Sequence, residues 1–221
     1  MNKVVSVNAG LPKEVDWNGE RIRTEIWKRP VAGRVPVHWT NLEGDGQPGL
    51  AGHGGVHRAV MVYQLESYRY WIEYFGQLKP GGSGENLTIE GLPDNEVCVG
   101  DRIRIGDALF EVTQPRVTCY RVGVRLQHSQ APALLISHRR PGFYMRVLEE
   151  GTVGAGDEIA IVSVCLSVSV VLAGTMIAEA EKPLTTSRRG CHPVTKSDLA
   201  IPVCRSRSDQ MSRSLSKPAN I

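Results

Sequence analysis

Hydrophobic and polar residues alternate in short runs along residues 1–162 of the chain. The runs are rich in β-branched residues, and glycine, proline, asparagine and aspartate separate them, which is typical of strands joined by turns. The predicted strands are Val4–Val7, Arg21–Trp27, Val35–Trp39, Ala59–Tyr63, Asn86–Ile89, Glu96–Val99, Asp101–Ile105, Leu109–Thr113 and Glu158–Val162. Many short strands with turn signals between them favour a mainly β fold, either a barrel or a sandwich.

Two segments have the residue spacing of a helix. Leu65–Phe75 places apolar and aromatic side chains on one helical face, and Gly76 follows as a C-cap. We interpret this aromatic face as core packing rather than as a cofactor-binding surface. Pro132–Arg139 is a shorter helix candidate with a weaker pattern. The sequence therefore predicts few and short helices.

The C-terminal segment, residues 163–221, differs in character from the rest. Residues 159–178 carry no charge, and this stretch is long enough for a membrane span. Within it, valine and leucine at residues 162–170 alternate with serine and cysteine, and this period of two favours an edge strand over a membrane helix. Beyond Thr185 the chain is rich in serine and arginine, so we predict disorder. The predicted organisation is a domain at 1–162 and an irregular tail at 163–221.

Composition narrows the function classes. The 221 residues carry a net charge of +3, with no run of Lys and Arg before the tail, so a nucleic-acid polymer is not an expected partner. Five cysteines without C-x-x-C spacing favour reduced thiols over a disulfide framework or an iron–sulfur site. The N-terminus enters a strand directly and shows no apolar signal-peptide core. We therefore expect a cytoplasmic protein.

The most informative residue is Cys119, which lies in the run T-Q-P-R-V-T-C-Y-R at residues 113–121. Pro115 ends the preceding strand, because proline has no N–H for the ladder, so the thiol falls on a loop. Arg116 and Arg121 are close in sequence and favour the thiolate, the form that binds soft metals or attacks electrophiles. The alternative is a buried structural cysteine.

A glycine-containing segment at residues 50–60 is a candidate ligand loop. His53 and His57 have the spacing of a helical metal pair, but Gly54 and Gly55 between them disfavour a helix. We expect a loop that presents backbone N–H groups and a histidine to an anionic ligand. An ordinary tight turn is the alternative.

A second glycine-rich loop, residues 80–84, precedes Glu85 and Asn86. It lacks the Lys-Ser/Thr ending of a phosphate-binding P-loop. Asn86 could donate a hydrogen bond to a ligand and Glu85 could accept one. A flexible loop that leads into a strand explains the composition equally well.

Seven runs carry a family resemblance when they are taken together and in order. They are KRPVAGRVPV at 28–37, LEGDGQ at 42–47, HGGVHRAV at 53–60, GENLTIEGL at 84–92, VGDRIRIG at 99–106, EVTQPRVTC at 111–119 and GFYMRVLEEGTVGAGD at 142–157. This set resembles the MOSC domain family, which is related to the C-terminal part of molybdenum cofactor sulfurases. The likeness is greatest to the stand-alone bacterial subgroup linked to 6-N-hydroxylaminopurine resistance. Residues 163–221 do not resemble the three-helix segment with which that subgroup typically continues.

The resemblance implies a MOSC-type, β-barrel-like domain that binds a pyranopterin molybdenum cofactor (molybdopterin). It implies that Cys119 is the metal ligand and the catalytic residue. Relatives reduce N-hydroxylated substrates such as hydroxylaminopurine bases, and the family is also associated with pyridoxal phosphate binding. The family usually has Asp-Lys where this chain has His57–Arg58, so the cation is retained at Arg58.

The predicted residues suit such a cofactor. Arg116, Lys28 and the His53–Gly55 loop can supply the cations and N–H donors that a cofactor phosphate needs. The chain has no flavin or iron–sulfur motif, so a reductase of a small-molecule substrate needs a separate electron-donor reductase as partner. The alternative function is a non-catalytic carrier of the cofactor, or of a persulfide sulfur, on the same cysteine.

Overall fold

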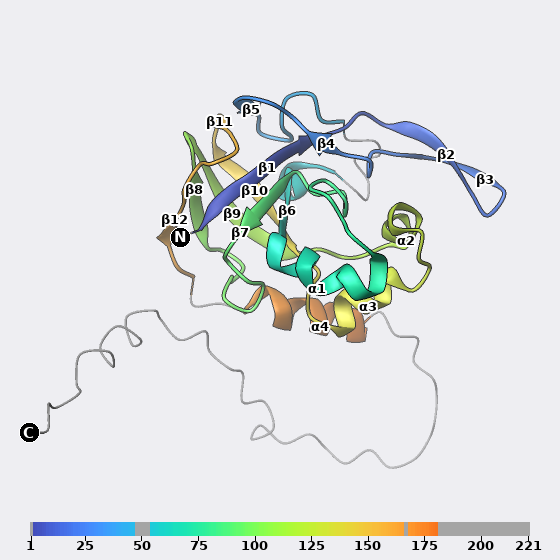
Figure 1. Ribbon diagram of the computed structural model, residues 1–221. Helices are drawn as coiled ribbons and strands as arrows, with labels where there is room; N and C mark the ends of the chain where they lie inside the picture. The colour runs from blue at the N-terminus through green and yellow to red at the C-terminus, as the bar shows by residue number, and fades with distance from the viewer. Residues whose placement is uncertain (1, 47–53, 166–167, 181–221) are drawn as a thin grey trace, which may run out of the picture.

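The computed structural model describes residues 2–46, 54–165 and 168–180 of the chain. These residues form twelve strands, four α-helices and one short 3-10 helix (Figure 1). The strands are β1 Lys3–Ala9, β2 Lys13–Trp17, β3 Glu20–Thr24, β4 Arg29–Pro30, β5 Val35–Val37, β6 Val60–Gln64, β7 Leu87–Glu90, β8 Arg102–Ile105, β9 Ala108–Pro115, β10 Phe143–Glu149, β11 Gly151–Val153 and β12 Ile159–Ser163. The helices are η1 Val56–Arg58, α1 Leu65–Phe75, α2 Tyr120–Leu126, α3 Ala131–Ser137 and α4 Val170–Ala180.

Eight strands form one sheet in the order β12-β8-β9-β10-β6-β7-β1-β4. All its named pairs are antiparallel except β6 with β7, which are parallel. The strand order is not that of a closed barrel, yet the sheet curls back on itself. Lys3 in β1 forms a single bridge with Glu158, and Val4 N donates to Asp157 O at 2.9 Å. The mainly β prediction is confirmed, and the barrel-like description holds in this loose sense.

The two faces of the sheet bury two separate clusters. Strand alternation sends Phe143 and Met145 of β10 into the inner cluster, with Phe110 and Val112 of β9. The outer cluster lies between β6 and helices α1, α2 and α3, and it contains Trp71, whose side chain is fully buried. The aromatic face of α1 is therefore core packing, as the sequence predicted.

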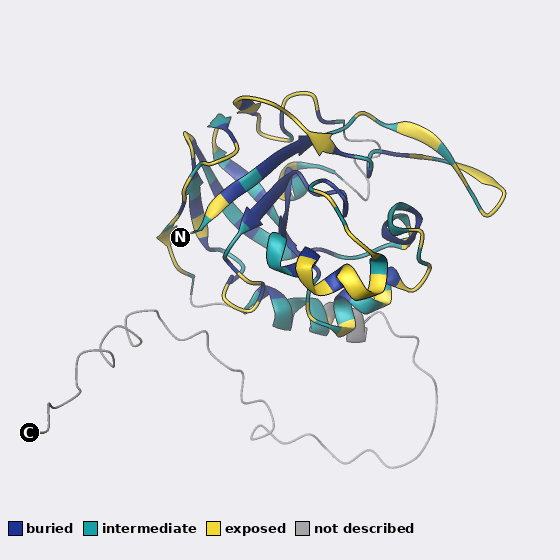
Figure 2. Ribbon diagram, viewed as in Figure 1, coloured by how far each residue is buried: buried dark blue, intermediate teal, exposed yellow. Residues whose placement is uncertain are grey.

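A two-stranded arm, β2 and β3, projects from the body of the protein (Figure 1). Its turn is Asn18–Gly19 with φ of 52° and 84°, the left-handed conformation that two-residue hairpin turns require. Most of the arm is exposed (Figure 2), but Thr24 at its end is buried. The arm thus delivers the residues that follow, 25–28, to the main body.

The structure corrects several predicted elements. Glu96–Val99 is not a strand, because Cys98 makes only an isolated bridge with Ser169. The helix α2 was not predicted, and α3 confirms the candidate at Pro132–Arg139 in a slightly shifted form. The predicted strand Arg21–Trp27 ends at Thr24, three residues early.

The predicted edge strand at residues 163–171 is also wrong, because β12 ends at Ser163 and α4 begins at Val170. The side chain of Val170 is fully buried in the inner cluster, and α4 packs on β9 and α3. The uncharged stretch 159–178 is therefore divided between β12 and α4. Among the described residues, no helix is both long and apolar enough to span a membrane.

Candidate cofactor-binding site

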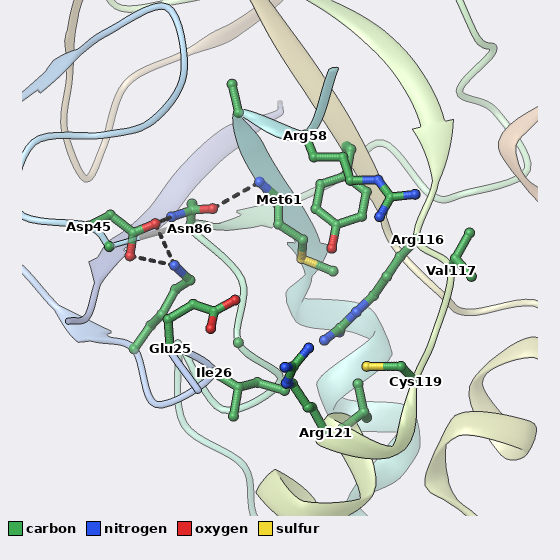
Figure 3. A pocket seen from close by; sticks show the side chains of 16 residues that line it. Glu25, Ile26, Asp45, Arg58, Met61, Asn86, Arg116, Val117, Cys119 and Arg121 are labelled. Atoms are coloured by element: carbon green, nitrogen blue, oxygen red, sulfur yellow. Dashed lines mark hydrogen bonds and ion pairs between the residues drawn. The ribbon is translucent and has the colours of Figure 1, made fainter. Parts of the chain in front are cut away.

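One pocket collects residues from four distant parts of the chain: the segment after the β2–β3 arm, the loop before β6, the start of β7, and the loop from β9 to α2. Tyr144 of β10 completes it. Its lining residues are Glu25, Ile26, Lys28, Asp45, Gly46, Arg58, Ala59, Met61, Gly84, Asn86, Arg116, Val117, Cys119, Arg121, Val122 and Tyr144. In Figure 3, Asp45, Asn86 and Glu25 lie on one side of the pocket, and Arg58, Arg116 and Cys119 lie on the other.

Cys119 stands where the sequence predicted, on the loop that follows β9. It is half-buried, has extended backbone dihedrals and is the N-cap of α2. Its loop is fastened at the start, because Arg116 N donates to Gly142 O at 2.9 Å. The side chain of Cys119 lines the pocket, so the alternative of a fully buried structural cysteine does not describe it.

Lys28, Asp45 and Asn86 form a buried network on the side of the pocket away from the thiol. Lys28 Nζ donates to both carboxylate oxygens of Asp45, and Asn86 Nδ2 donates to Asp45 Oδ2 at 2.8 Å. Asn86 Oδ1 in turn accepts from Met61 N at 3.0 Å. Both Lys28 and Asp45 are nearly inaccessible to solvent, so the Lys28 charge is already neutralised within the protein. Lys28 and Asn86 thus line the pocket as predicted, but with their polar groups largely engaged.

Arg116 lines the pocket and also holds the glycine-rich loop. Its Nη2 donates to Ser83 O at 2.7 Å and its Nη1 to Ser83 Oγ at 3.1 Å. In the same loop Gly84 has φ of 89°, and a Cβ there would lie 2.5 Å from Ile26 Cγ1. The glycine is therefore required both by its backbone and by close packing.

Glu85 is not brought to the pocket. Its side chain is fully buried and accepts hydrogen bonds from Gly81 N, Ser83 N, the Tyr68 hydroxyl and the Thr88 hydroxyl. Burial and the neighbouring Glu85 carboxyl raise the pKa of Tyr68, so the phenol stays protonated and donates to Glu85. This places Glu85 as an anchor of the loop rather than as a pocket-lining group.

The loop around the predicted histidine pair is described only from Gly54 onward, and His53 lies outside the described residues. Gly54 and Gly55 do not line the pocket, and His57 is exposed on η1 and does not line it either. Arg58 does line it, with its guanidinium 5.8 Å from the centre of the Tyr144 ring. With the amide oxygen of Gln114 turned toward it, Arg58 Nε donates to Gln114 at 2.7 Å.

Four polar lining residues were not singled out from the sequence: Glu25, Asp45, Arg121 and Tyr144. Asp45 and Tyr144 lie within the family-like runs 42–47 and 142–157, which is a signal that could have identified them. Arg121 was noted only as a neighbour of the thiol. Glu25 had no sequence signal, because the predicted strand extended through it.

Two of these residues have polar atoms without partners in the described part of the chain. They are Glu25 Oε2 and Arg121 Nε, both inaccessible to solvent. Burial raises the pKa of the Glu25 carboxyl, although Lys28 and Arg121 oppose the shift. Burial also raises the pKa of Tyr144, against the opposing charges of Arg116 and Arg58. A buried polar atom without a partner costs free energy, so these groups suit a bound ligand with donors and negative charge.

The pocket can therefore bind an anionic group beside a thiol. Lys28, Arg58, Arg116 and Arg121 outnumber the two carboxylates, Glu25 and Asp45. Within the described residues no group of three or more His, Cys, Asp or Glu side chains could hold a metal ion. A metal at Cys119 would consequently need further ligands from a cofactor.

In a comparison with protein families, the model of the MOSC domain matches residues 50–160 of the chain. Protein YflK of Bacillus subtilis (strain 168) is 38% identical over 161 residues, which cover 72% of this chain and 73% of YflK. A protein of Gibberella moniliformis (strain M3125 / FGSC 7600) named "Reductase" is 34% identical over 164 residues, which cover 72% of this chain but only 29% of that longer protein.

Among solved structures, YiiM from Geobacillus stearothermophilus has a similar fold. It is 30% identical in sequence with a TM-score of 0.63, and the alignment covers 80% of this chain and 82% of YiiM.

Proposed function

The chain belongs to the MOSC domain family, and we propose that it is a molybdenum-cofactor-dependent reductase of N-hydroxylated compounds such as hydroxylaminopurine bases. The observation that carries the proposal is the half-buried thiol of Cys119 in a pocket that it shares with Arg58, Arg116 and Arg121. The Gibberella protein named "Reductase" supports the reaction class, though this chain matches 29% of its length.

The residues of the pocket fit a pyranopterin molybdenum cofactor. Cys119 offers a soft thiolate ligand for the metal. Arg121, whose buried Nε lacks a partner among the described residues, offers charge-assisted hydrogen bonds to a phosphate. The unpartnered Oε2 of Glu25 suits the N–H groups at the edge of a pterin ring. When bound, such a cofactor would supply the electrons that break an N–O bond.

The roles of the other residues follow from their contacts. Lys28 and Asp45 neutralise each other and give the pocket a rigid wall. Arg116, bound to Ser83, keeps the 81–84 loop in place and adds positive charge. The protein thus binds, orients and neutralises the ligand, while the electrons come from a separate reductase.

The test is turnover of 6-N-hydroxylaminopurine by cofactor-loaded protein with an electron-donor reductase system. We expect conversion to adenine, which chromatography resolves from the substrate. Cofactor that stays bound without turnover under any electron donor would contradict the reductase and favour a carrier of the cofactor.

A further inference from the structure

Tyr144 is a polar residue of the pocket whose hydroxyl forms no hydrogen bond in the described part of the chain. It is half-buried and lines the pocket together with Cys119. By contrast, the Tyr63 hydroxyl donates to Arg140 O at 3.0 Å, and the Tyr68 hydroxyl donates to Glu85 Oε1 at 2.6 Å. The Tyr144 hydroxyl is therefore, like Arg121 Nε, a donor of this pocket that is available to a ligand.

The strand that carries Tyr144 holds it rigidly. In β10, Tyr144 pairs with Met61 of β6 on one side and with Gln114 of β9 on the other. Its carbonyl oxygen accepts from the Thr113 hydroxyl at 3.1 Å. Because side chains alternate along a strand, Phe143 and Met145 fill the inner core and Tyr144 faces outward to the pocket. A residue on a central strand is positioned more precisely than one on a loop.

The surroundings keep the phenol protonated. The charged or titratable groups that face it are Arg116, Arg58, Cys119 and Glu25. Burial raises the pKa of Tyr144 more strongly than the two arginines lower it, so its O–H remains a donor at neutral pH.

We propose that Tyr144 donates a hydrogen bond, and then its proton, to the hydroxyl oxygen that leaves the substrate nitrogen. This assignment rests on the proposed reductase function. The balanced reaction converts R–NHOH, two electrons and two protons into R–NH₂ and water. The N–O bond breaks, one N–H and one O–H bond form, and the electrons come from the separate reductase. Tyr144 supplies the proton of the new O–H bond and recovers one from solvent.

The substrate class follows from this arrangement. A fixed O–H donor in the same pocket as the thiol selects substrates whose oxygen can accept a proton as it leaves. N-hydroxylated amines and amidines have such an oxygen and are uncharged. A proton donated to the departing hydroxyl prevents the expulsion of hydroxide, and this kind of general acid catalysis contributes about 10²–10⁴-fold in rate.

The test compares Tyr144→Phe with Tyr120→Phe in the cofactor-loaded protein. Tyr120 is the matched control, because it adjoins Cys119 in sequence but is 52% exposed and does not line the pocket. We expect Tyr144→Phe to lower kcat about 100-fold at pH 8, with KM changed by roughly threefold or less. Tyr120→Phe should retain the wild-type kcat.

Three further measurements separate a proton donor from a structural residue. The molybdenum and pterin content of Tyr144→Phe should equal that of the wild type. Its kcat should rise as the pH falls, because solvent then supplies the proton, whereas the wild type changes less. Tyr144→His, which restores a donor, should recover part of the rate.

The outcomes distinguish this inference from the proposal on which it rests. Equal kcat for Tyr144→Phe and the wild type, or loss of cofactor from Tyr144→Phe, would overturn the proton-donor role and leave the reductase proposal standing. A wild type that binds the cofactor and reduces no N-hydroxylated substrate would overturn the reductase itself.

Discussion

Two buried aspartates show that burial alone does not mark a functional site. Asp45 lies in the pocket of Cys119, and Lys28 donates to both of its carboxylate oxygens. Asp94 lines a different cavity near α1 and, among the described residues, accepts from Gln64 Nε2 at 2.5 Å and Gly142 N at 3.1 Å. Burial raises the pKa of Asp94 to about 6.

The two regions differ in charge and in reactive groups. Both contain buried polar atoms without partners in the described chain, namely Gln64 Oε1 and Glu66 Oε2 in the Asp94 cavity and Glu25 Oε2 and Arg121 Nε in the Cys119 pocket. The Asp94 cavity combines Glu66 and Asp94 with Arg139 and Arg140, so its formal charges balance. The Cys119 pocket has an excess of cations, a thiol and a phenol whose hydroxyl has no partner in the described chain. We therefore assign the ligand chemistry to the Cys119 pocket. We expect Asp94 to make the free energy of unfolding depend on pH.

The largest expected effect is the removal of the cation beside Asp45. Lys28→Ala leaves a buried carboxylate uncompensated, which costs about 3–5 kcal/mol in the free energy of unfolding. Arg21→Ala is the matched control, because its pair with Glu14 is exposed and 3.9 Å long, and it should change stability by about 0.5 kcal/mol or less. Urea titration of both variants measures the difference, and equal effects would show that the Lys28–Asp45 pair contributes no more than a surface contact.

The next effect concerns Asp94 and depends on pH. Because its folded pKa of about 6 exceeds the ordinary 3.8, the folded protein holds this proton more tightly than the unfolded chain. Its contribution is therefore complete below pH 4 and is lost as the pH rises through 6. The difference between the two pKa values corresponds to about 3 kcal/mol in the free energy of unfolding.

Asp94→Asn should remove this dependence. Unfolding free energies measured by urea between pH 4 and pH 7.5 should fall less in the variant than in the wild type. Asp16→Asn, at an exposed position of the arm, should behave as the wild type does. A constant difference between Asp94→Asn and the wild type over this range would contradict the assignment.

A third prediction concerns α4 and the boundary at residue 162 that the sequence predicted for the domain. Because Val170 is fully buried in the inner cluster, a chain that ends at Val162 should lose about 1.5–3 kcal/mol of stability relative to one that ends at Ala180. Urea titration of the two shortened chains measures this. If they are equally stable, α4 adds nothing and the boundary at 162 is correct.

The smallest effect is expected at Arg121. Its replacement by alanine removes a cation from the pocket and should weaken cofactor retention roughly tenfold, with the fold intact. Arg125→Ala is the control on the same helix, because Arg125 does not line the pocket and lies 5.9 Å from the Trp27 ring. Arg116→Ala should also lower retention, but it frees Ser83 as well and so combines two causes. Equal retention by Arg121→Ala and Arg125→Ala would contradict the role of Arg121.

The sequence predicted most strands because alternation and turn residues are local signals. It placed Cys119 on a loop because Pro115 ends β9. Helix α2 was not predicted, because Gly123, Val122 and Val124 have low helix propensity. In the structure, the burial of Val122 and Val124 stabilises the helix. The strand prediction for residues 163–171 failed because the period of two ends at Val170, where the helix begins.

The candidate site was predicted only where the chain is locally distinctive. Lys28, Asn86, Arg58, Arg116 and Cys119 do line one pocket, as expected. Asp45 was missed because its contacts to Lys28 and Asn86 span 17 and 41 residues of sequence. Glu85 was assigned to the site, but hydrogen bonds from the distant Tyr68 hydroxyl and from the nearby Gly81 N hold it as the anchor of the loop.

The most direct test of the account is the molybdenum and pterin content of the protein purified from a cofactor-competent host. We expect the wild type and Cys165→Ser, whose thiol lies outside the pocket, to contain equal amounts of molybdenum and pterin. In Cys119→Ser the molybdenum content should fall by roughly tenfold or more. Wild-type protein without molybdenum and pterin, or Cys119→Ser with full content, would contradict the account.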